Sequence, residues 1–374
     1  MFKENPDNNN ITPAGSDSAP AGKKTPLLGM TLPQLQQVVA RLGLPRFNAG
    51  QIARWLYVAR VTDLDAMTDL SKAARHKLAA AYCVGREAPL SAQRSQDGTV
   101  KYLFDSGCGL DVEAVYIPDR DRATLCVSSQ AGCKMHCVFC MTGRQGFHGN
   151  LTAAAIINQI LSVDDSEKLT NVVFMGMGEP TDNLAAVLQA IDVLTAPWGL
   201  AWSPKRITVS SIGKMPELKT LVEQTKVHIA ISVHSPYSRE RAQLMPVEQA
   251  WPVSGVLATL RNYDFAHQRR LSLEYIIFDG VNSDLRHADA LARLLHGTAA
   301  RVNLIRFHAI PGSDLRPAPQ QVMEAFRDRL NQQGVTATIR ASRGEDIMAA
   351  CGMLAGADKE KADKEKADKD KESR

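Results

Sequence analysis

Apolar residues recur at helical spacing near the start of the chain, in residues 32–42 and again in residues 52–56. Leu, Val, Ile and Trp side chains stand three or four positions apart there, which places them on one face of a helix. We therefore predict a small helical domain over residues 25–95.

Two β-prone segments follow, VKYLFDS and DVEAVYI, separated by a short stretch that contains Gly107, Cys108 and Gly109. Runs of this kind around a glycine-containing turn are typical of a β-hairpin. We expect this hairpin to extend the main domain, residues 96–356.

The rest of that domain alternates short β-branched runs with amphipathic helical patterns. The candidate strands are ATLCVS, NVVFMG, RITVSS, VHIAIS, LSLEYIIF and VNLIRF. The clearest helix follows Asn183, a candidate N-cap. Strands that alternate with helices predict an α/β fold with a parallel sheet. Six units predict a partial (βα)6 barrel, open on one side, with its site at the C-terminal ends of the strands.

The two tails lack the apolar residues needed for a core. Residues 1–24 are rich in Asn, Pro, Ser and Gly, and residues 357–374 repeat a charged Ala-Asp-Lys-Glu-Lys pattern. Both are predicted to be disordered. The chain has no apolar run of membrane-spanning length and no apolar stretch for a signal peptide, and its seven cysteines are an odd number. These features predict a cytoplasmic protein without membrane contact.

The formal net charge of +4 is small, but it is unevenly distributed. Residues 25–95 hold nine Lys and Arg against four Asp and Glu, whereas each tail is balanced. If the protein binds a nucleic acid, this helical domain is the expected docking module. A basic face that merely interacts with solvent is the alternative.

Three cysteines lie within eight residues, Cys133, Cys137 and Cys140. Three thiolates from one loop are typical of iron-sulfur ligation, and they leave one iron of a [4Fe-4S] cluster open for S-adenosylmethionine (SAM). Zinc held by the same thiolates with His136 or His148 is an alternative, as are inert thiols. With Phe139 before the last cysteine and βα repeats after it, the motif resembles the radical SAM signature.

Further segments narrow the resemblance. VEAVYIP, CVSSQAGCKMHCVFCMTGRQGF, GMGEP, SVHS and ACGM occur in this order, and together they resemble the RlmN family. This resemblance covers residues 32–354 and implies a radical SAM enzyme that methylates C2 of an adenine in 23S rRNA and in tRNA. It also implies two SAM molecules per turnover and an electron donor such as flavodoxin or ferredoxin. We expect a monomer.

By this resemblance, one SAM methylates Cys351, and a radical from a second SAM activates the S-methyl group for addition to C2. Cys126 then attacks Cys351 to form a disulfide and release the product, and Glu113 is the expected base for the C2 proton. From position alone, Cys126 suits a buried structural thiol and Cys351 ends a helical run, EDIMAACGML. Glu113 shares the alternating face of Val115 and Ile117, where a carboxylate is costly unless it is paired or functional; a charge that protects an edge strand is the alternative.

The resemblance also implies SAM contacts at strand ends. The expected residues are Gly178, Glu179, Ser210, Ser232, Val233 and His234. A tight turn at the glycines and a core histidine are the structural alternatives. His308 occupies a position where relatives carry Asn, and we expect it to contact SAM as well.

Two other functions are considered. A methylase specific for C8 of adenine would use the same cluster and cysteines, so the residues alone do not separate it from a C2 methylase. A zinc-stabilised RNA-binding protein without turnover would have no use for Glu113, Cys126 and Cys351.

Overall fold

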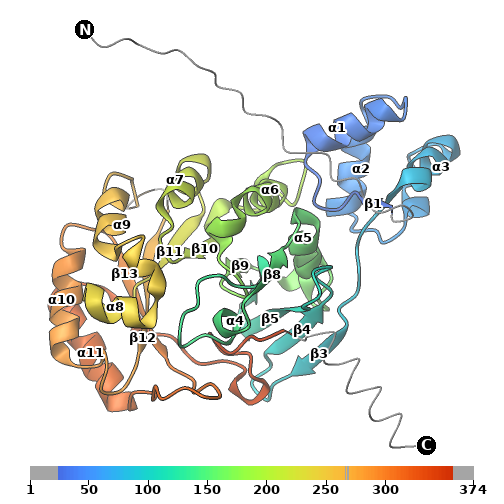
Figure 1. The fold of residues 1–374 in the computed structure, drawn as a ribbon. Coiled ribbons are helices and arrows are strands. Elements are labelled where there is room, and N and C mark those ends of the chain that lie inside the picture. The colour runs from blue at the N-terminus through green and yellow to red at the C-terminus, as the bar shows by residue number, and fades with distance from the viewer. Residues whose placement is uncertain (1–23, 266, 268, 357–374) are drawn as a thin grey trace, which may run out of the picture.

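The computed structural model describes residues 24–265, 267 and 269–356. The predicted disordered tails, residues 1–24 and 357–374, lie outside this range apart from Lys24. Figure 1 shows a small helical unit, formed by α1, α2 and α3, beside a larger body built on a long sheet.

The helical unit contains α1 (Leu32–Arg41), α2 (Asn48–Tyr57), the 3-10 helix η1 (Leu64–Ala66) and α3 (Lys72–Ala81). Thr31 begins α1 with a capping box, in which its side chain accepts from the N–H of Gln34 while the Gln34 side chain accepts from the N–H of Thr31. The helices predicted from the apolar spacing are thus present.

The helical unit is joined firmly to the larger body. Strand β1 (Thr25–Pro26) pairs with β2 (Tyr82–Cys83) within the unit, and the apolar core continues from this unit into the sheet. The guanidinium of Arg60 donates to Oγ of Ser166 at 3.1 Å, and that of Arg86 donates to the carbonyl of Leu161 at 2.5 Å. These arginines therefore act across the junction.

Ten strands form one sheet in the order β14, β13, β12, β11, β10, β9, β6, β5, β4, β3. The parallel strands are β6 (Arg122–Cys126), β9 (Asn171–Phe174), β10 (Ile207–Ser211), β11 (His228–Ser232), β12 (Leu271–Ile277), β13 (Arg301–Arg306) and β14 (Ala337–Ile339). The antiparallel extension is β3 (Ser91–Arg94), β4 (Val100–Phe104) and β5 (Val112–Asp119). A separate antiparallel pair is β7 (Gln130–Gly132) with β8 (Phe147–Asn150).

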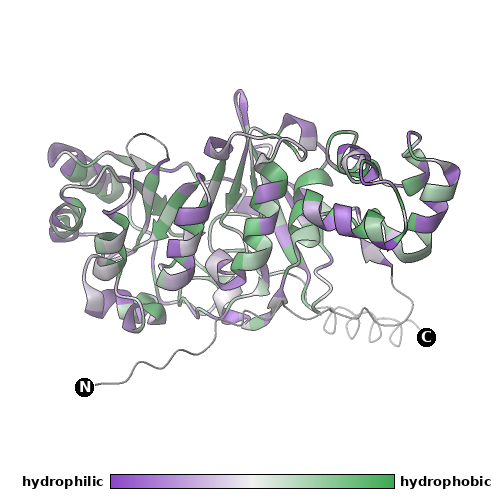
Figure 2. Cartoon of the chain, turned by 90° about the horizontal axis from the view of Figure 1, so that it is seen from above, coloured by the Kyte–Doolittle hydropathy of each residue, from purple (hydrophilic) through white to green (hydrophobic). Residues whose placement is uncertain are grey.

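Helices follow most parallel strands. They are α4 (Met141–Arg144), α5 (Ala153–Leu161), α6 (Leu184–Thr195), α7 (Met215–Gln224), α8 (Ser238–Leu244), α9 (Val253–Leu260), α10 (Leu285–Leu295) and α11 (Gln320–Gln332). Short 3-10 helices are η2 (Ser166–Lys168), η3 (Pro180–Asn183), η4 (Pro204–Arg206), η5 (Pro246–Gln249) and η6 (Glu345–Ile347). Figure 2 shows mostly hydrophobic strands inside and hydrophilic residues on the outward helix faces.

The predicted partial barrel is confirmed. All six expected strands form and run parallel, and β14 continues the sheet beyond them. Because β14 and β6 do not pair, the barrel stays open on one side. The hairpin of β4 and β5 also forms. The extension begins earlier than predicted, since β3 falls within residues 25–95 but pairs with β4.

Asn183 occupies the N-cap position of α6, but its side chain makes no capping hydrogen bond. Its amide instead donates to the carbonyls of Ser129 at 2.8 Å and Leu151 at 2.7 Å. The residue thus connects η3 to the residue before β7 and to the residue after β8, on both sides of the cysteine loop. No helix in the described part of the chain is long and apolar enough to cross a membrane.

Candidate active site

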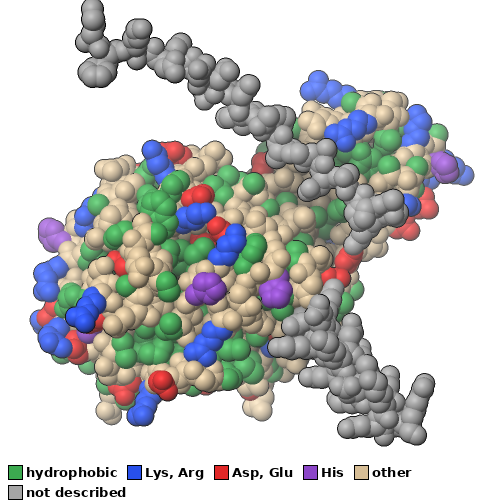
Figure 3. Space-filling view, in the orientation of Figure 1, with side chains coloured by type: hydrophobic (Ala, Val, Ile, Leu, Met, Phe, Trp, Pro, Cys, Tyr) green, Lys and Arg blue, Asp and Glu red, His purple; other side chains and the backbone are tan. Residues whose placement is uncertain are grey.

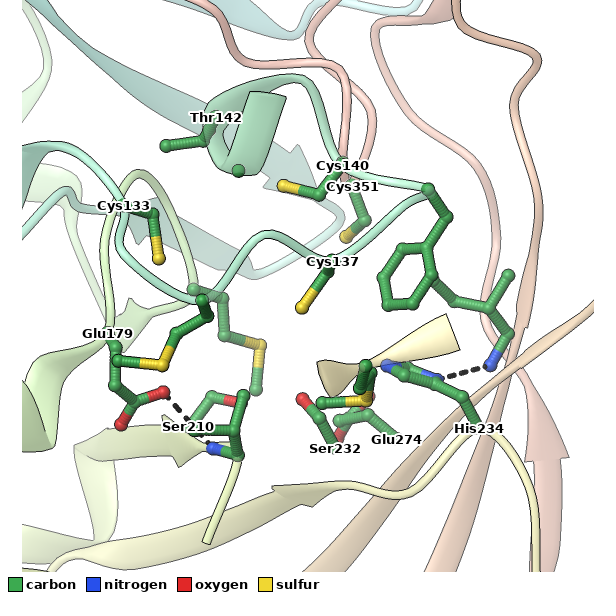
Figure 4. Close-up of a pocket in the computed structure, with 18 of the residues that line it drawn as sticks. Cys133, Cys137, Cys140, Thr142, Glu179, Ser210, Ser232, His234, Glu274 and Cys351 are labelled. Carbon is green, nitrogen blue, oxygen red and sulfur yellow. Dashed lines mark hydrogen bonds between the residues drawn. The ribbon is translucent and has the colours of Figure 1, made fainter. Parts of the chain in front are cut away.

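The cysteine loop lies between β7 and α4. Gly132 ends β7 with a φ of +73°, and a Cβ there would stand 1.9 Å from the carbonyl oxygen of Gly146, so this position requires glycine. Cys133, Cys137 and Cys140 all line one cavity at the C-terminal ends of the parallel strands (Figure 4). The loop therefore brings the three thiols to a common space.

This cavity holds about 880 Å³, including its open mouth, which is within the range of small-molecule sites. Burial raises the pKa of Cys133 to about 12 and that of Cys137 well above its usual value, and the neighbouring thiols raise the pKa of Cys137 further. Ionised thiolates are therefore disfavoured here unless a bound cationic centre compensates their charge. Among the described residues, no three His, Cys, Asp or Glu side chains are arranged for a single metal ion.

The Gly-Met-Gly-Glu-Pro turn follows β9 and forms the opposite wall. Gly178 has a φ of +92°, and a Cβ there would lie 2.4 Å from the Cβ of Gln130. The Oε1 atom of Gln130 accepts from the N–H of Glu179 at 2.8 Å. Close approach to Gln130 thus fixes the turn at the cavity wall.

Glu179 is buried and uses both carboxylate oxygens within the protein. Oε1 accepts from the N–H of Thr181 at 3.1 Å, and Oε2 accepts from the N–H of Ile212 at 3.1 Å. Burial raises the pKa of Glu179, and these hydrogen bonds oppose that rise. Its carboxylate therefore connects the ends of β9 and β10, in addition to facing the cavity.

Ser210 and Ser232 line the cavity at the ends of β10 and β11. The side chain of Val233 is buried in the core and does not line the cavity. Any contact of Val233 with a ligand is therefore left to its backbone.

His234 lies in the left-handed region, with a φ of +55°. Its Nδ1 accepts from the N–H of Ile276 at 3.0 Å, so its proton is on Nε2, and its ring packs edge-on against Phe139 with centroids 4.8 Å apart. Burial lowers the pKa of His234 to about 3. The neutral ring lines the cavity beside the cysteine loop (Figure 4).

A buried ion pair that the sequence gave no sign of stands behind these strand ends. Arg241 is fully buried and pairs with Glu248. Its guanidinium also donates to the carbonyls of Val233 at 3.0 Å, Ser232 at 2.9 Å and Ile212 at 3.0 Å. Arg241 is therefore a positioning residue for the cavity wall.

Cys351 lies in a turn, so the predicted helical run at this position is wrong. Only η6 forms there, because Gly344 and Met348 adopt left-handed conformations that end it on both sides. The N–H of Met141 donates to the carbonyl of Gly352 at 2.8 Å. This contact holds the exposed Cys351 at the cavity, beside Cys140 in Figure 4.

Cys126 ends β6 and is buried. Burial and the nearby Cys351 raise its pKa to about 12, and Arg340 opposes this shift. Cys126 does not line the main cavity, but it is close enough to Cys351 for the two thiols to interact electrostatically.

Glu113 lies in β5, which pairs with both β4 and β6, so the edge-strand alternative is wrong. The carboxylate pairs with Nζ of Lys101 at 2.9 Å and accepts from the N–H of Ala355 at 2.9 Å. It does not line the cavity. Glu113 instead contacts the segment that follows Cys351.

Two further polar residues line the cavity and were missed by sequence reasoning. Glu274 of β12 accepts from Asn303 at 2.8 Å and from Arg340 at 3.4 Å. The second residue is Arg340, which follows the short strand β14. A single charged residue in an apolar strand, such as Glu274, or after a short strand, such as Arg340, gives no distinctive sequence signal. The pair places a carboxylate and a guanidinium near Cys351.

His308 does not line this cavity. It lies in an adjacent groove, where Nε2 is 3.0 Å from Oγ of Ser342 and Nδ1 is 3.2 Å from a carboxylate oxygen of Glu345. His308 therefore lies in the groove and not at the cavity wall, and its SAM contact stays a prediction.

Known proteins with similar sequences share both parts of the chain. Residues 25–84 match the ribosomal RNA large subunit methyltransferase N-terminal domain, and residues 127–291 match the radical SAM superfamily. A probable dual-specificity RNA methyltransferase RlmN of Porphyromonas gingivalis is 56% identical over 91% of this chain and 96% of its own length. The RlmN of Syntrophobacter fumaroxidans is 42% identical over 87% of this chain and 96% of its own.

A solved structure shows the same fold. The crystal structure of a radical SAM methyltransferase from Sphaerobacter thermophilus superposes with a TM-score of 0.83 at 37% identity, covering 88% of this chain and 99% of that one. Sequence and fold agree over nearly the whole length of both proteins. The chain therefore belongs to the RlmN family of radical SAM methyltransferases.

Proposed function

We propose that this chain methylates C2 of an adenine in 23S rRNA and in tRNA, with a [4Fe-4S] cluster held by Cys133, Cys137 and Cys140. The observation that carries the proposal is one cavity lined by these three thiols together with Cys351. Family membership supports the RNA substrates. When bound, the cluster supplies the electron that cleaves SAM and makes an unreactive carbon accessible to methylation.

Three soft thiol donors and a polar opposite wall fit such a cluster and its SAM. Gly178 and Glu179, Ser210, Ser232 and His234 line that wall. We assign SAM binding to these residues and to the backbone of Val233. Two SAM molecules serve each turnover, one for the methyl group and one for its activation.

Cys351 carries the methyl group on its sulfur, and Cys126 releases the product. The Cys126 thiolate attacks the Cys351 sulfur, a disulfide forms, and the bond from that sulfur to the carbon on the base breaks. This carbon keeps the electron pair and takes up a proton, which completes the methyl group on the base. Two cellular thiols, or one dithiol, then supply the two electrons that reduce the disulfide. Glu113 is assigned as the base for the C2 proton, and its contact with Ala355 places it next to the Cys351 segment.

The remaining assignments concern partners. The helical unit, with its basic surplus, docks the RNA. Arg60 contacts Ser166 at the junction, whereas Arg54, whose side chain is 63% exposed beside Asp69, and the exposed Arg41 and Arg46 are available for docking. We assign flavodoxin or ferredoxin as electron donor, a monomeric state and a cytoplasmic location.

Product analysis tests the regiochemistry. Mass spectrometry of digested RNA, after reaction under anaerobic reduction, is expected to show 2-methyladenosine; 8-methyladenosine would instead establish the C8 alternative. The purified protein should contain iron and sulfide and absorb visible light until dithionite bleaches it. A colourless zinc protein would refute the proposal.

A cysteine variant tests the methyl carrier. Cys351→Ala should abolish RNA methylation while it retains the cluster spectrum. Cys83→Ala is the matched control, because Cys83 lies in β2 of the helical unit. Methylation by the Cys351→Ala variant at the wild-type rate would exclude the carrier role.

A further inference from the structure

Cys351 lies between two hollows of the surface. The active-site cavity and a neighbouring groove are separate, yet Ile305, Arg340 and Cys351 line both. The groove continues outward from this shared wall along the ends of β13 and β14. Cys351 therefore borders both the cavity and the groove.

The groove is rich in hydrogen-bond donors that carry positive charge. Arg306, Arg340 and Arg343 line it together with His308 and Ser342. Within the described residues, the Arg306 guanidinium has no hydrogen bond or ion pair. Arg343 has only a distant pairing with Asp119, at 3.5 Å, and the Asp119 side chain is 61% exposed.

The acidic groups near the groove do not cancel these charges. Glu345 faces His308, but its side chain is 66% exposed, and exposed ion pairs are weak. Glu274 neutralises Arg340 from the cavity side. Arg306 and Arg343 thus remain available for an anion from outside.

The chemistry at Cys351 limits what this anion can be. The carbon on its sulfur must meet SAM on the cavity side, so the adenine has to approach from another direction. A nucleotide drawn out of an RNA strand brings its own phosphates to the entrance. Arginine guanidinium groups match phosphate oxygens in charge and geometry.

We propose that the groove of Arg306 and Arg343 binds the RNA phosphates that flank the target adenine. This inference rests on the proposed function, because it takes RNA as the substrate and Cys351 as the methyl carrier. Figure 3 shows Lys, Arg and His side chains near the middle of one face of the large body, consistent with a binding face outside the helical unit. The groove adds a second RNA contact to that unit.

The test compares two double variants that lose the same charge. Arg306→Gln with Arg343→Gln removes the groove cations. Arg270→Gln with Arg301→Gln removes two exposed cations at the N-terminal ends of β12 and β13, away from the groove. Affinity for a tRNA anticodon stem-loop is measured by fluorescence anisotropy over a range of KCl concentrations. The salt slope is the slope of the logarithm of the binding constant against the logarithm of the KCl concentration. The groove variant should bind on the order of tenfold more weakly, and the magnitude of its salt slope should be smaller by about 1 to 2. The control variant should keep the wild-type slope.

Failure of this proposal can be distinguished from failure of the proposed function by a second measurement. Intact-protein mass spectrometry monitors the methylation of Cys351 by SAM in the absence of RNA. The groove variant should methylate Cys351 like the wild type. An unchanged salt slope of the groove variant, or an equal change in the control variant, would overturn the groove assignment. The assignment would also be overturned if the groove variant bound RNA normally but no longer bound an acidic electron-donor protein. Wild-type protein that never methylates Cys351 would instead refute the proposed function.

A folding defect would not prevent the test. Single Arg343→Gln changes a side chain that is already 32% exposed, and it should lower the slope by about 1. Arg306→Lys with Arg343→Lys should restore the slope, because the charges return. Failure of both results would also contradict the proposal.

Discussion

The N–H of Ile276 donates to Nδ1 of His234 at 3.0 Å, which links the segment after β11 to β12. The bond requires an unprotonated Nδ1, and burial lowers the pKa of this histidine to about 3. His234 therefore stays neutral through the range in which an exposed histidine would titrate.

This shift makes stability depend on pH. The unfolded chain binds a proton at His234 near pH 6.5 and the folded chain does not, so the free energy of unfolding should fall as the pH drops from about 6.5 toward 3. Between pH 7 and pH 5 the loss from this residue is about 2 kcal/mol. Urea unfolding of the metal-free, reduced protein measures it.

His234→Asn is the suitable comparison. Asparagine tolerates the positive φ and can accept the same hydrogen bond, but it does not titrate. The variant should show a shallower pH dependence, and identical slopes for both proteins would rule out His234 as the source.

A methyl group at Gly178 should damage the SAM wall. Gly178→Ala combines a positive φ with a contact of 2.4 Å to Gln130, whereas Gly280→Ala has a positive φ and no atom within 4 Å of the new Cβ. The control should lose about 1 kcal/mol from backbone strain, and Gly178→Ala a further 1 to 3 kcal/mol. Thermal unfolding and SAM binding check both, and equal losses would argue against the packing role.

Loss of Arg241 should destabilise the protein strongly. Arg241→Met leaves Glu248 buried without its partner and frees three carbonyls, so we expect a decrease of about 3 to 5 kcal/mol in the free energy of unfolding and loss of SAM binding. Arg286→Ala removes an ion pair in which the arginine side chain is 85% exposed, and it should change stability by less than about 1 kcal/mol. Chemical denaturation of both variants measures the two changes in the free energy of unfolding, and equal changes would contradict the positioning role of Arg241.

Cys126→Ala should trap the enzyme on its substrate, because no thiol remains to attack Cys351. A covalent protein–RNA adduct is then expected on denaturing gels, at any pH. In the wild type, the pKa of Cys126 near 12 leaves little thiolate at neutral pH, so adduct decay should accelerate about tenfold per pH unit from 7 to 9. A decay rate independent of pH would exclude Cys126 as the attacking group.

The barrel was predictable from the sequence because its strands are apolar β-branched runs of ordinary length. Strands β3 and β14 were not, since the Ser91–Arg94 strand is exposed and polar, and the Ala337–Ile339 strand has only three residues. The segment before Cys351 looked helical because its apolar spacing is helical. Left-handed backbone at Gly344 and Met348 overrides that spacing.

The cysteines and strand-end residues of the candidate site were found through motifs and the family resemblance. Arg241, Glu274 and Arg340 were not, because each is a single charged residue whose partner is distant in sequence or hidden until the chain folds. Glu274 and Arg340, for example, are 66 positions apart. The SAM contact of His308 was expected from the family resemblance and stays a prediction. Its side chain lies in the groove beside the cavity, and position along a loop does not fix the direction of a side chain.

The turn at Cys351 is fastened on both sides of the cysteine. The N–H of Met141 holds the carbonyl of Gly352, the hydroxyl of Thr142 holds that of Leu354 at 2.6 Å, and the N–H of Ala349 holds that of Gly344 at 2.8 Å. If Cys351 carries the methyl group as proposed, the anchored main chain leaves rotation about its Cα–Cβ bond to move that group between the cavity and the groove. Transfer of the methyl group from SAM to the adenine then requires rotation of one side chain and no domain movement.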